Sequence, residues 1–479
     1  MPSTATTAKI AKKSAGSTGG SLVRKFGPAI PLGVALLHGA MTGKPAAAPA
    51  SVAIAPASIP APYPLLTKGG HPVDWWFVFK LNAAKFPKCG NDVDGRNCPF
   101  GIGTPVNYGK VPFGQRYVYA SADSPTLVDG AMQCLGTSTD DPAGATFDEV
   151  YNGNFYYVLW NDQFLGSPQG SPAGSPPMKC GKDGKGECPG PWGHSKGMLA
   201  WNAQGEGLVM QVTTPSWPAS GNPKFPRPGD GNTLGCVNDD NVEWSQHFFA
   251  LRLTEPDLVS VLHGMADASV VTGAQAVDQA ALEAVVNNGG PQEVQDAVNA
   301  LGVQTSTNTT VTSTTLSTKV QFFAKPPMAT VPPWQMVSSL LGGVSLRTAN
   351  WSEQTLDLIP STTADTPIGC WQPSDPSLSA PPGAVDIATT GQWEKTPFSL
   401  EAGGIKGNAV GDGNHAKLGV STSGTSHYSI FGDMNQQGAL SGKCSASQNG
   451  RGGMFFVIDN AQLWTSLSGL LKGDSAPMQ

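Results

Sequence analysis

The chain has 479 residues, of which only 13% are charged, while 59 are glycine and 41 are proline. An average soluble protein carries roughly 25% charged residues, so this composition argues against a coiled coil, a helical bundle and a charged disordered chain. The net charge of −6 at pH 7 is unlike that of a typical basic nucleic-acid binder, but histidines gain charge in mild acid, so a protein that acts on phosphates in an acidic compartment is still allowed.

The first 66 residues are rich in Ala, Pro, Ser, Thr and Gly, and we predict that residues 1–66 form a disordered leader. Within it, Arg24 and Lys25 precede a short apolar run that is similar to an export signal. This leader and the even count of eight cysteines favour a secreted protein or one of an acidic or oxidising compartment. We expect local disulfides rather than zinc sites, with a pairing that stays open, and no membrane span.

Apolar runs rich in β-branched and aromatic residues predict buried strands along the rest of the chain. They lie at residues 72–81, 155–160, 207–212, 247–253, 319–323 and 454–458. The stretch 273–301 is helical in composition, with a break at 287–290, and a second helix is expected at 461–471. A Thr/Ser-rich tract at 305–318 reads as a linker. Strands on both sides of a helical middle predict two α/β halves, a mixed α/β and α+β fold.

Two short motifs are the candidates for chemistry. His194 and Lys196 belong to the sequence G-H-S-K-G, and His415 and Lys417 belong to N-H-A-K-L, about 220 residues later. On an extended strand, residues i and i+2 point to the same face, so each motif presents an imidazole beside an ammonium group. If the two halves pack about a pseudo-two-fold axis, two histidines and two lysines surround a single anion.

This arrangement suits cleavage of a phosphodiester. The lysines would hold the non-bridging oxygens and offset the charge of the transition state. One neutral histidine would attack phosphorus and form a phosphohistidine, while the other, protonated, would donate its proton to the leaving oxygen. One neutral and one charged imidazole coexist best in mild acid. The chemistry requires no metal or other cofactor, and the residues do not show which histidine is the nucleophile.

Nine short segments, in this order, resemble the deoxyribonuclease II family. They are H-P-V-D-W-W-F-V-F-K-L (71–81), V-L-W-N-D-Q (158–163), G-H-S-K-G (193–197), G-N-T-L-G-C-V (231–237), E-P-D-L (255–258), L-I-P-S (358–361), N-H-A-K (414–417), G-D-M-N (432–435) and R-G-G (451–453). The resemblance implies a phospholipase D-like fold, a pseudo-dimer in which two α/β halves share one active site.

The resemblance also implies an activity: an acid endonuclease that hydrolyses DNA without divalent metal and leaves 3′-phosphate and 5′-hydroxyl ends. His194, Lys196, His415 and Lys417 match the family's catalytic motifs, and Asn435 matches an amide that donates a hydrogen bond to the substrate phosphate. The DNA partner would be contacted mainly through its phosphates. The enzyme would be a monomeric pseudo-dimer or a homodimer.

The expected domains follow from the same reasoning. Residues 67–255 would form the first half, residues 256–317 a helical insertion with the linker, and residues 318–479 the second half. Two alternatives stay open. The chain could be another phospholipase D-like phosphodiesterase, acting on lipid or nucleotide diesters, or a non-catalytic binding protein on the same scaffold. Preference for single- or double-stranded DNA is not predicted.

Overall fold

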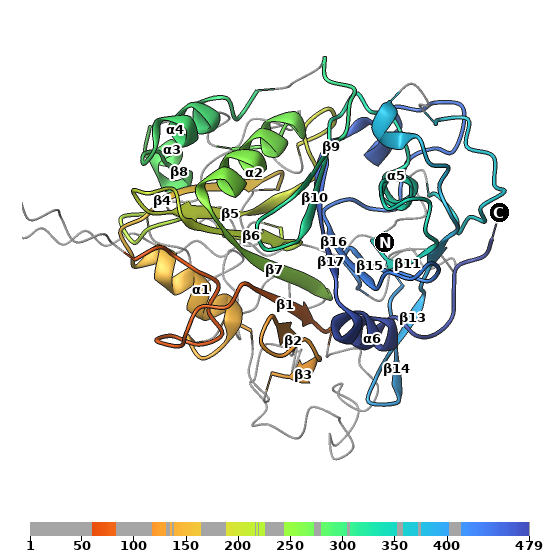
Figure 1. Cartoon of the computed structure of the whole chain (residues 1–479), viewed down its shortest axis with the longest axis horizontal. Coiled ribbons are helices and arrows are strands. Elements are labelled where there is room, and N and C mark those ends of the chain that lie inside the picture. The colour runs from red at the N-terminus through yellow and green to blue at the C-terminus, as the bar shows by residue number, and fades with distance from the viewer. Residues whose placement is uncertain are drawn as a thin grey trace, which may run out of the picture. The chain divides into compact units, whose positions relative to one another are not determined.

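The apolar runs of the sequence form two large β-sheets in the computed structural model (Figure 1). The structure describes residues 60–82, 117–130, 135–136, 138–163, 188–215, 217–218, 220–225, 244–272, 279–303, 307–351, 358–371, 375–401 and 413–478. The expected leader lies outside the described residues as far as residue 59, and residues 58–479 group as one compact unit.

The first sheet is antiparallel throughout and has eight strands in the order β3-β2-β1-β7-β6-β5-β4-β8. Its strands are β1 (Trp75–Lys80), β2 (Tyr117–Ser121), β3 (Val128–Asp129), β4 (Tyr156–Asn161), β5 (Lys196–Trp201), β6 (Gly207–Val212), β7 (Gln246–Leu253) and β8 (Val286–Asn287). The strands predicted at 72–81, 155–160, 207–212 and 247–253 are confirmed as β1, β4, β6 and β7, with ends that differ by at most three residues.

The second sheet has seven strands in the order β12-β11-β15-β16-β17-β10-β9, of which β11 and β12 are parallel and the other neighbours antiparallel. Its strands are β9 (Thr312–Thr315), β10 (Gln321–Lys325), β11 (Leu346–Ala349), β12 (Val385–Ile387), β15 (Leu418–Ser421), β16 (Tyr428–Gly432) and β17 (Gly453–Asp459). A separate hairpin consists of β13 (Thr390–Trp393) and β14 (Thr396–Ser399).

Six α-helices lie in the described part of the chain and give the protein its mixed α/β character. They are α1 (Pro142–Tyr151), α2 (Glu255–Asp267), α3 (Gln279–Val285), α4 (Gln292–Asn299), α5 (Pro333–Leu340) and α6 (Ala461–Leu470), with short 3₁₀ turns η2 (Pro376–Leu378) and η3 (Ser447–Gly450). Helix α1 begins where the Asp141 carboxylate accepts from the Gly144 amide, and α6 begins at Asn460, whose side chain accepts from two amides.

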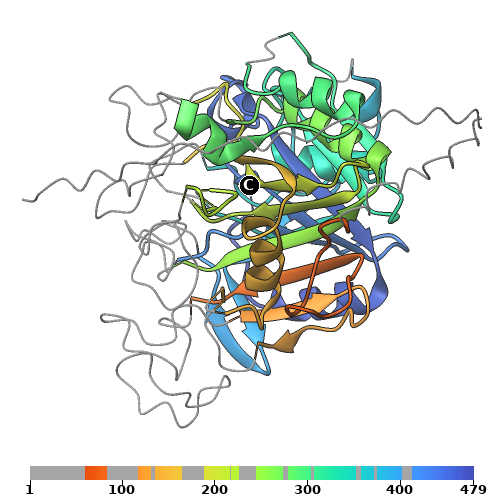
Figure 2. The ribbon, with the colours of Figure 1, turned by 90° about the vertical axis from the view of Figure 1, so that its left-hand side faces the viewer.

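Side chains alternate between two cores along each central strand, as the period of two in a β-strand requires. In β1, Phe77 and Phe79 belong to a core that includes α2, whereas Trp76 and Val78 belong to another core that includes α1. Figures 1 and 2 show these two helices against opposite faces of the first sheet. The core on the α2 side also contains residues of the second sheet, so the two sheets share it.

In this shared core, aromatic rings of one sheet pack against aromatic rings of the other. Phe431 of β16 stacks on Phe77 and on Phe249, with ring centroids 4.8 Å and 4.5 Å apart, and Phe249 also contacts Phe456 of β17. Stacked aromatic pairs of this kind contribute about 0.5–1.5 kcal/mol each beyond the burial of their surface. The strand ends that hold the His-x-Lys motifs are therefore fixed against each other through packed strands.

The two sheets repeat one connectivity. In chain order, β1, α1, β4, β5, β6, β7 and α2 correspond to β10, α5, β11, β15, β16, β17 and α6, and in space β1-β7-β6-β5-β4 matches β10-β17-β16-β15-β11. Gly197 of β5 pairs with Gln211 of β6. The matching pair in the second sheet is Leu418 with Phe431. In each pair, the first residue directly follows a motif lysine. The two motifs therefore occupy equivalent positions in the two sheets.

Three features differ from the sequence-based boundaries. Packing begins before residue 67, because the Leu65 amide donates to the Thr146 hydroxyl and Ala61 is buried. The tract 305–318, expected as a linker, contains β9, since threonine is β-branched and suits an edge strand. Helix α2, within the expected insertion, packs in the shared core. None of the described helices has the length and apolar character needed to cross a bilayer.

Candidate active site

Both His-x-Lys motifs reach one pocket of about 880 Å³. Its lining includes His194 from the first motif and His415 from the second, together with Asn435, which follows β16. Lys196 is the first residue of β5 and Lys417 directly precedes β15; both side chains are buried and neither is among the described residues that line the pocket. The structure therefore brings the five predicted site residues to one region, with the histidines and the amide at the pocket wall.

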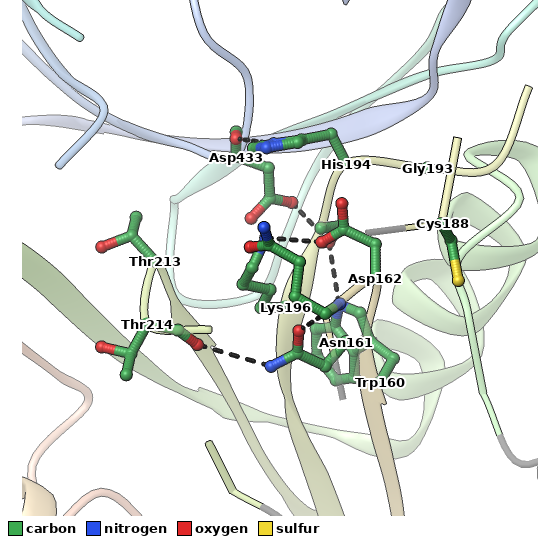
Figure 3. Close-up of polar contacts among 12 residues, drawn as sticks. Trp160, Asn161, Asp162, Cys188, Gly193, His194, Lys196, Thr213, Thr214 and Asp433 are labelled. Carbon is green, nitrogen blue, oxygen red and sulfur yellow. Dashed lines mark hydrogen bonds and ion pairs between the residues drawn. The ribbon is translucent and has the colours of Figure 1, made fainter. Parts of the chain in front are cut away.

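His194 is held by main-chain groups of the second sheet. Its amide donates to the carbonyl oxygen of Gly452 at 2.8 Å. Its Nδ1 donates to the carbonyl oxygen of Asp433, also at 2.8 Å (Figure 3). Gly452 directly precedes β17, and Asp433 directly follows β16. The first motif is thus anchored to strand ends of the opposite sheet.

His415 makes the equivalent contacts in the reverse direction. Its amide donates to the carbonyl oxygen of Ser245, and its Nδ1 donates to the carbonyl oxygen of Thr213, again both at 2.8 Å. Ser245 directly precedes β7, and Thr213 directly follows β6. A carbonyl oxygen only accepts, so in both histidines the neutral imidazole carries its proton on Nδ1 and has its lone pair on Nε2.

The pocket holds both imidazoles neutral. Burial lowers the pKa of His194 well below its usual value, and the nearby cations Lys196, Arg451 and Lys417 lower it further. Burial also lowers the pKa of His415, followed by the charges of Lys417 and Lys196. Each histidine therefore feels the lysine of the other motif. A negative charge nearby, such as that of a bound phosphate, raises the pKa of an imidazole and so favours its protonated form.

Lys196 is not a free cation. Its ammonium group forms an ion pair at 2.5 Å with the Asp162 carboxylate (Figure 3). The other oxygen of this carboxylate accepts from the Arg451 guanidinium at 2.8 Å. Asp162 is fully buried and lies just after β4. Arg451 also lines the pocket and donates to the carbonyl oxygens of Cys188 and Gly193. Two cations thus share one carboxylate, which leaves a net positive charge beside His194.

Asp433 links the two sheets a second time. Its carboxyl oxygen accepts from the Ser195 hydroxyl at 2.6 Å, and that hydroxyl accepts from the Trp160 indole at 2.8 Å. Burial raises the pKa of Asp433 to about 7, against the lowering effect of the Ser195 hydrogen bond and the Lys196 charge. This carboxyl group is therefore neutral in mild acid, where it adds no negative charge to the site.

Lys417 and Asn435 complete the set. The Lys417 ammonium group donates to the carbonyl oxygen of His415 at 2.6 Å, and its amide donates to Nδ1 of the buried His247. Asn435 donates from its side-chain nitrogen to the Gln437 side chain at 3.1 Å, while its buried side-chain oxygen accepts no hydrogen bond from any described residue. The Asn435 amide is therefore placed at the pocket wall but engaged with a neighbouring side chain.

The sequence model of the family described as Deoxyribonuclease II matches residues 104–368, more than half of the chain. The chain belongs to the deoxyribonuclease II family. It is therefore a hydrolase, a deoxyribonuclease of the endonuclease type, with DNA as its substrate, and the resemblance drawn from the nine segments is confirmed. The matched range contains His194 and ends before His415. A comparison with curated proteins gave no match.

Several residues around the histidines of this deoxyribonuclease carry no motif of their own in the sequence. They are Asp162, Trp244, Trp351, Asp433 and Arg451. Asp162, Asp433 and Arg451 lie in the segments that carry the family resemblance, which was the one available signal. Trp217, by contrast, is buried in the core with Phe147 and Phe248.

The cysteines follow the predicted use of disulfides in part. Cys370 and Cys444 are joined by a disulfide, and Cys188 is disulfide-bonded as well. None of the cysteines in the described residues is a free thiol. Cys89, Cys98 and Cys180 lie outside the described residues. In the described part of the chain, no group of three or more His, Cys, Asp or Glu side chains is placed to hold a metal ion.

Proposed function

We propose that this deoxyribonuclease is an acid endonuclease that uses His194 and His415 as a nucleophile and acid pair, with no divalent metal. The two halves would form a phospholipase D-like pseudo-dimer with one shared active site. The observation that carries the proposal is the pair of histidines in one pocket, each held through Nδ1 by a carbonyl group of the opposite sheet. The repeated strand order of the two sheets supports the pseudo-dimer.

In the first step, the Nε2 lone pair of one neutral histidine attacks phosphorus, and the bond from phosphorus to the 5′ oxygen breaks. The second histidine is protonated once the phosphate anion is bound, and it donates that proton to the leaving 5′ oxygen. The products of this step are a 5′-hydroxyl end and a phosphohistidine that stays bonded to the 3′ oxygen of the fragment on the 5′ side of the cut.

In the second step, the second histidine accepts a proton from water, whose oxygen attacks phosphorus and breaks the nitrogen–phosphorus bond. This releases a 3′-phosphate end and restores both imidazoles. Lys196, Lys417 and Arg451 supply the positive field that offsets the charge of the transition state. Asn435 would donate a hydrogen bond to the phosphate, after its amide leaves Gln437.

The decisive assay is nicking of plasmid DNA at about pH 5 in excess chelator. The wild type is expected to cut, and the variants His194→Ala and His415→Ala are expected to lose turnover by at least about a hundredfold while keeping their fold. His71→Ala is the matched control, because His71 is exposed and paired with Asp123 away from the pocket. Loss of cutting in chelator, restored by magnesium, would refute the metal-independent mechanism.

The same preparation separates the alternatives. Mapping of the cut ends should give 3′-phosphate and 5′-hydroxyl termini, and an alkaline quench should trap phosphate on a histidine of the wild type. A chain that binds DNA equally well with and without its histidines, and never cuts it, would instead be a binding protein on this scaffold. A chain that cuts only lipid or small nucleotide diesters would be a different phosphodiesterase.

A further inference from the structure

The two histidines have equivalent anchors but different flanks. Trp160 of β4 and Ala349 of β11 each pair with the residue that follows a motif lysine. Two positions further along the chain stand Asp162 in the first sheet and Trp351 in the second. One equivalent position thus holds a carboxylate beside His194 and an indole on the side of His415.

A second pair of equivalent positions shows the same contrast. Gly452 and Ser245 accept hydrogen bonds from the amides of the two histidines. The residue directly before Gly452 is Arg451, and the residue directly before Ser245 is Trp244. On the His194 side, the residues at these two positions are Asp162 and Arg451, and they form an ion pair with each other.

On the His415 side, the same two positions are both tryptophans. The Trp351 and Trp244 rings lie 6.1 Å and 6.4 Å from the His415 ring, with interplanar angles of 68° and 70°. Neither indole is stacked face to face on the imidazole, and both are half-buried and line the pocket. The same lining includes Pro215, two residues after Thr213, whose carbonyl oxygen accepts from His415.

Among the described residues that line the pocket, charge lies on the His194 flank, while Lys417 is buried next to His415 and is not part of the lining. Apart from the two histidines, Arg451 is the one basic or acidic side chain among the described residues that line the pocket. A phosphate requires cations, whereas an uncharged, flat nucleobase is bound by aromatic faces, and base–aromatic stacking tolerates every base. The two flanks of the pocket therefore match the two chemical parts of one nucleotide.

We propose that Trp244 and Trp351 form a nucleobase subsite beside His415, on which the base next to the scissile phosphate stacks. This inference rests on the proposed nuclease function and adds a substrate subsite to it. The base is presented by a single strand, or by a duplex after the base has left its stack. The subsite gives affinity without choosing a sequence, because each base has a π-face.

The test uses single-stranded oligonucleotides with one cleavable phosphodiester, all other linkages being methylphosphonates. One substrate has both flanking bases, and two others lack the base on the 5′ or the 3′ side of the cleavable bond. We expect the wild type, in chelator, to cut the intact substrate about five- to a hundredfold faster than one of the two abasic substrates. Trp244→Ala and Trp351→Ala should cut the intact substrate as slowly as the abasic one.

Two controls make this result specific. Trp393→Ala removes a half-buried tryptophan in the β13–β14 hairpin, away from the pocket lining, and should keep the wild-type preference. Trp244→Phe and Trp351→Phe should restore most of the preference, because a smaller aromatic face still stacks. Thermal unfolding of each variant confirms that the fold is intact.

The outcomes separate the two proposals. If the wild type cuts intact and both abasic substrates at equal rates, the base subsite is refuted while the nuclease function stands. The subsite is also refuted if the tryptophan variants slow cutting of intact and abasic substrates by the same factor, which indicates a role in shaping the pocket alone. If the wild type cuts neither these substrates nor plasmid DNA in chelator, the proposed function itself fails.

Discussion

Asp433→Asn tests whether a buried neutral carboxyl group sets the pH range of this enzyme. Burial raises the pKa of Asp433 from the ordinary 3.8 to about 7. The folded state then holds a proton that the unfolded state releases between about pH 4 and pH 7, so stability falls as pH rises through this window. At about 1.36 kcal/mol for each pKa unit, the loss from this group is on the order of 4 kcal/mol.

The asparagine side chain is neutral at every pH and resembles the protonated acid in shape. The difference in unfolding free energy between Asp433→Asn and the wild type should therefore move in favour of the variant by about 4 kcal/mol between pH 4 and pH 8. Urea unfolding of both proteins at several pH values measures this difference. The lowered pKa values of the histidines act in both proteins and largely cancel in the comparison.

Activity gives a second readout. Above about pH 7, an ionised Asp433 places a negative charge beside His194 and weakens the field that holds phosphate. The wild type should therefore lose activity at a pH where Asp433→Asn keeps more of it.

Asp141→Asn is the control. Burial raises the pKa of Asp141 to about 6, but this residue caps α1. Asparagine caps a helix equally well, so that variant should change the stability slope and leave the pH–activity profile unchanged. A pH-independent difference between Asp433→Asn and the wild type would refute the reasoning.

Two further changes test what holds the site in place. Asp162→Asn should lower the unfolding free energy by about 3–5 kcal/mol, because Lys196 and Arg451 then lack the buried carboxylate that joins them. Urea unfolding measures this loss. A loss below about 1 kcal/mol would show that other groups compensate for the missing carboxylate. The double variant Cys370→Ser with Cys444→Ser opens a loop with a sequence separation of 74, which should cost about 4 kcal/mol by loop-closure entropy; an unchanged unfolding midpoint, measured without reductant, would contradict this.

The strands were predictable from sequence where apolar and aromatic residues run together. The run W-W-F-V-F-K appears as β1 and M-F-F-V-I lies within β17, because burial on both faces requires continuous apolar residues. Strands with weaker composition were missed. The short β15, L-G-V-S, is strand only because it pairs with β11 and β16, and this pairing is a property of the tertiary structure.

The two motifs could be found from sequence, but their surroundings could not. The two His-x-Lys motifs can be recognised in the sequence itself. Their equivalent positions at the starts of β5 and β15 follow from the repeated strand order of the two sheets. The partners of these residues come from other strand ends: Asp162 follows β4, Asp433 follows β16 and Arg451 precedes β17. Such contacts depend on strand register and on how two sheets pack, and no local spacing in the sequence records either one.

Under the proposed function, the unequal flanks of the pocket would let a repeated site act on a substrate with direction. Identical motifs related by a pseudo-two-fold axis would accept a DNA strand equally well in both orientations, yet only one of the two bridging oxygens of a phosphodiester leaves in the proposed reaction. Asp162 and Arg451 beside one histidine, and Trp351 and Trp244 beside the other, remove this equivalence. Under the proposed function, the ionic flank and the aromatic flank orient the strand, and the orientation in turn assigns the two histidines different parts in the chemistry.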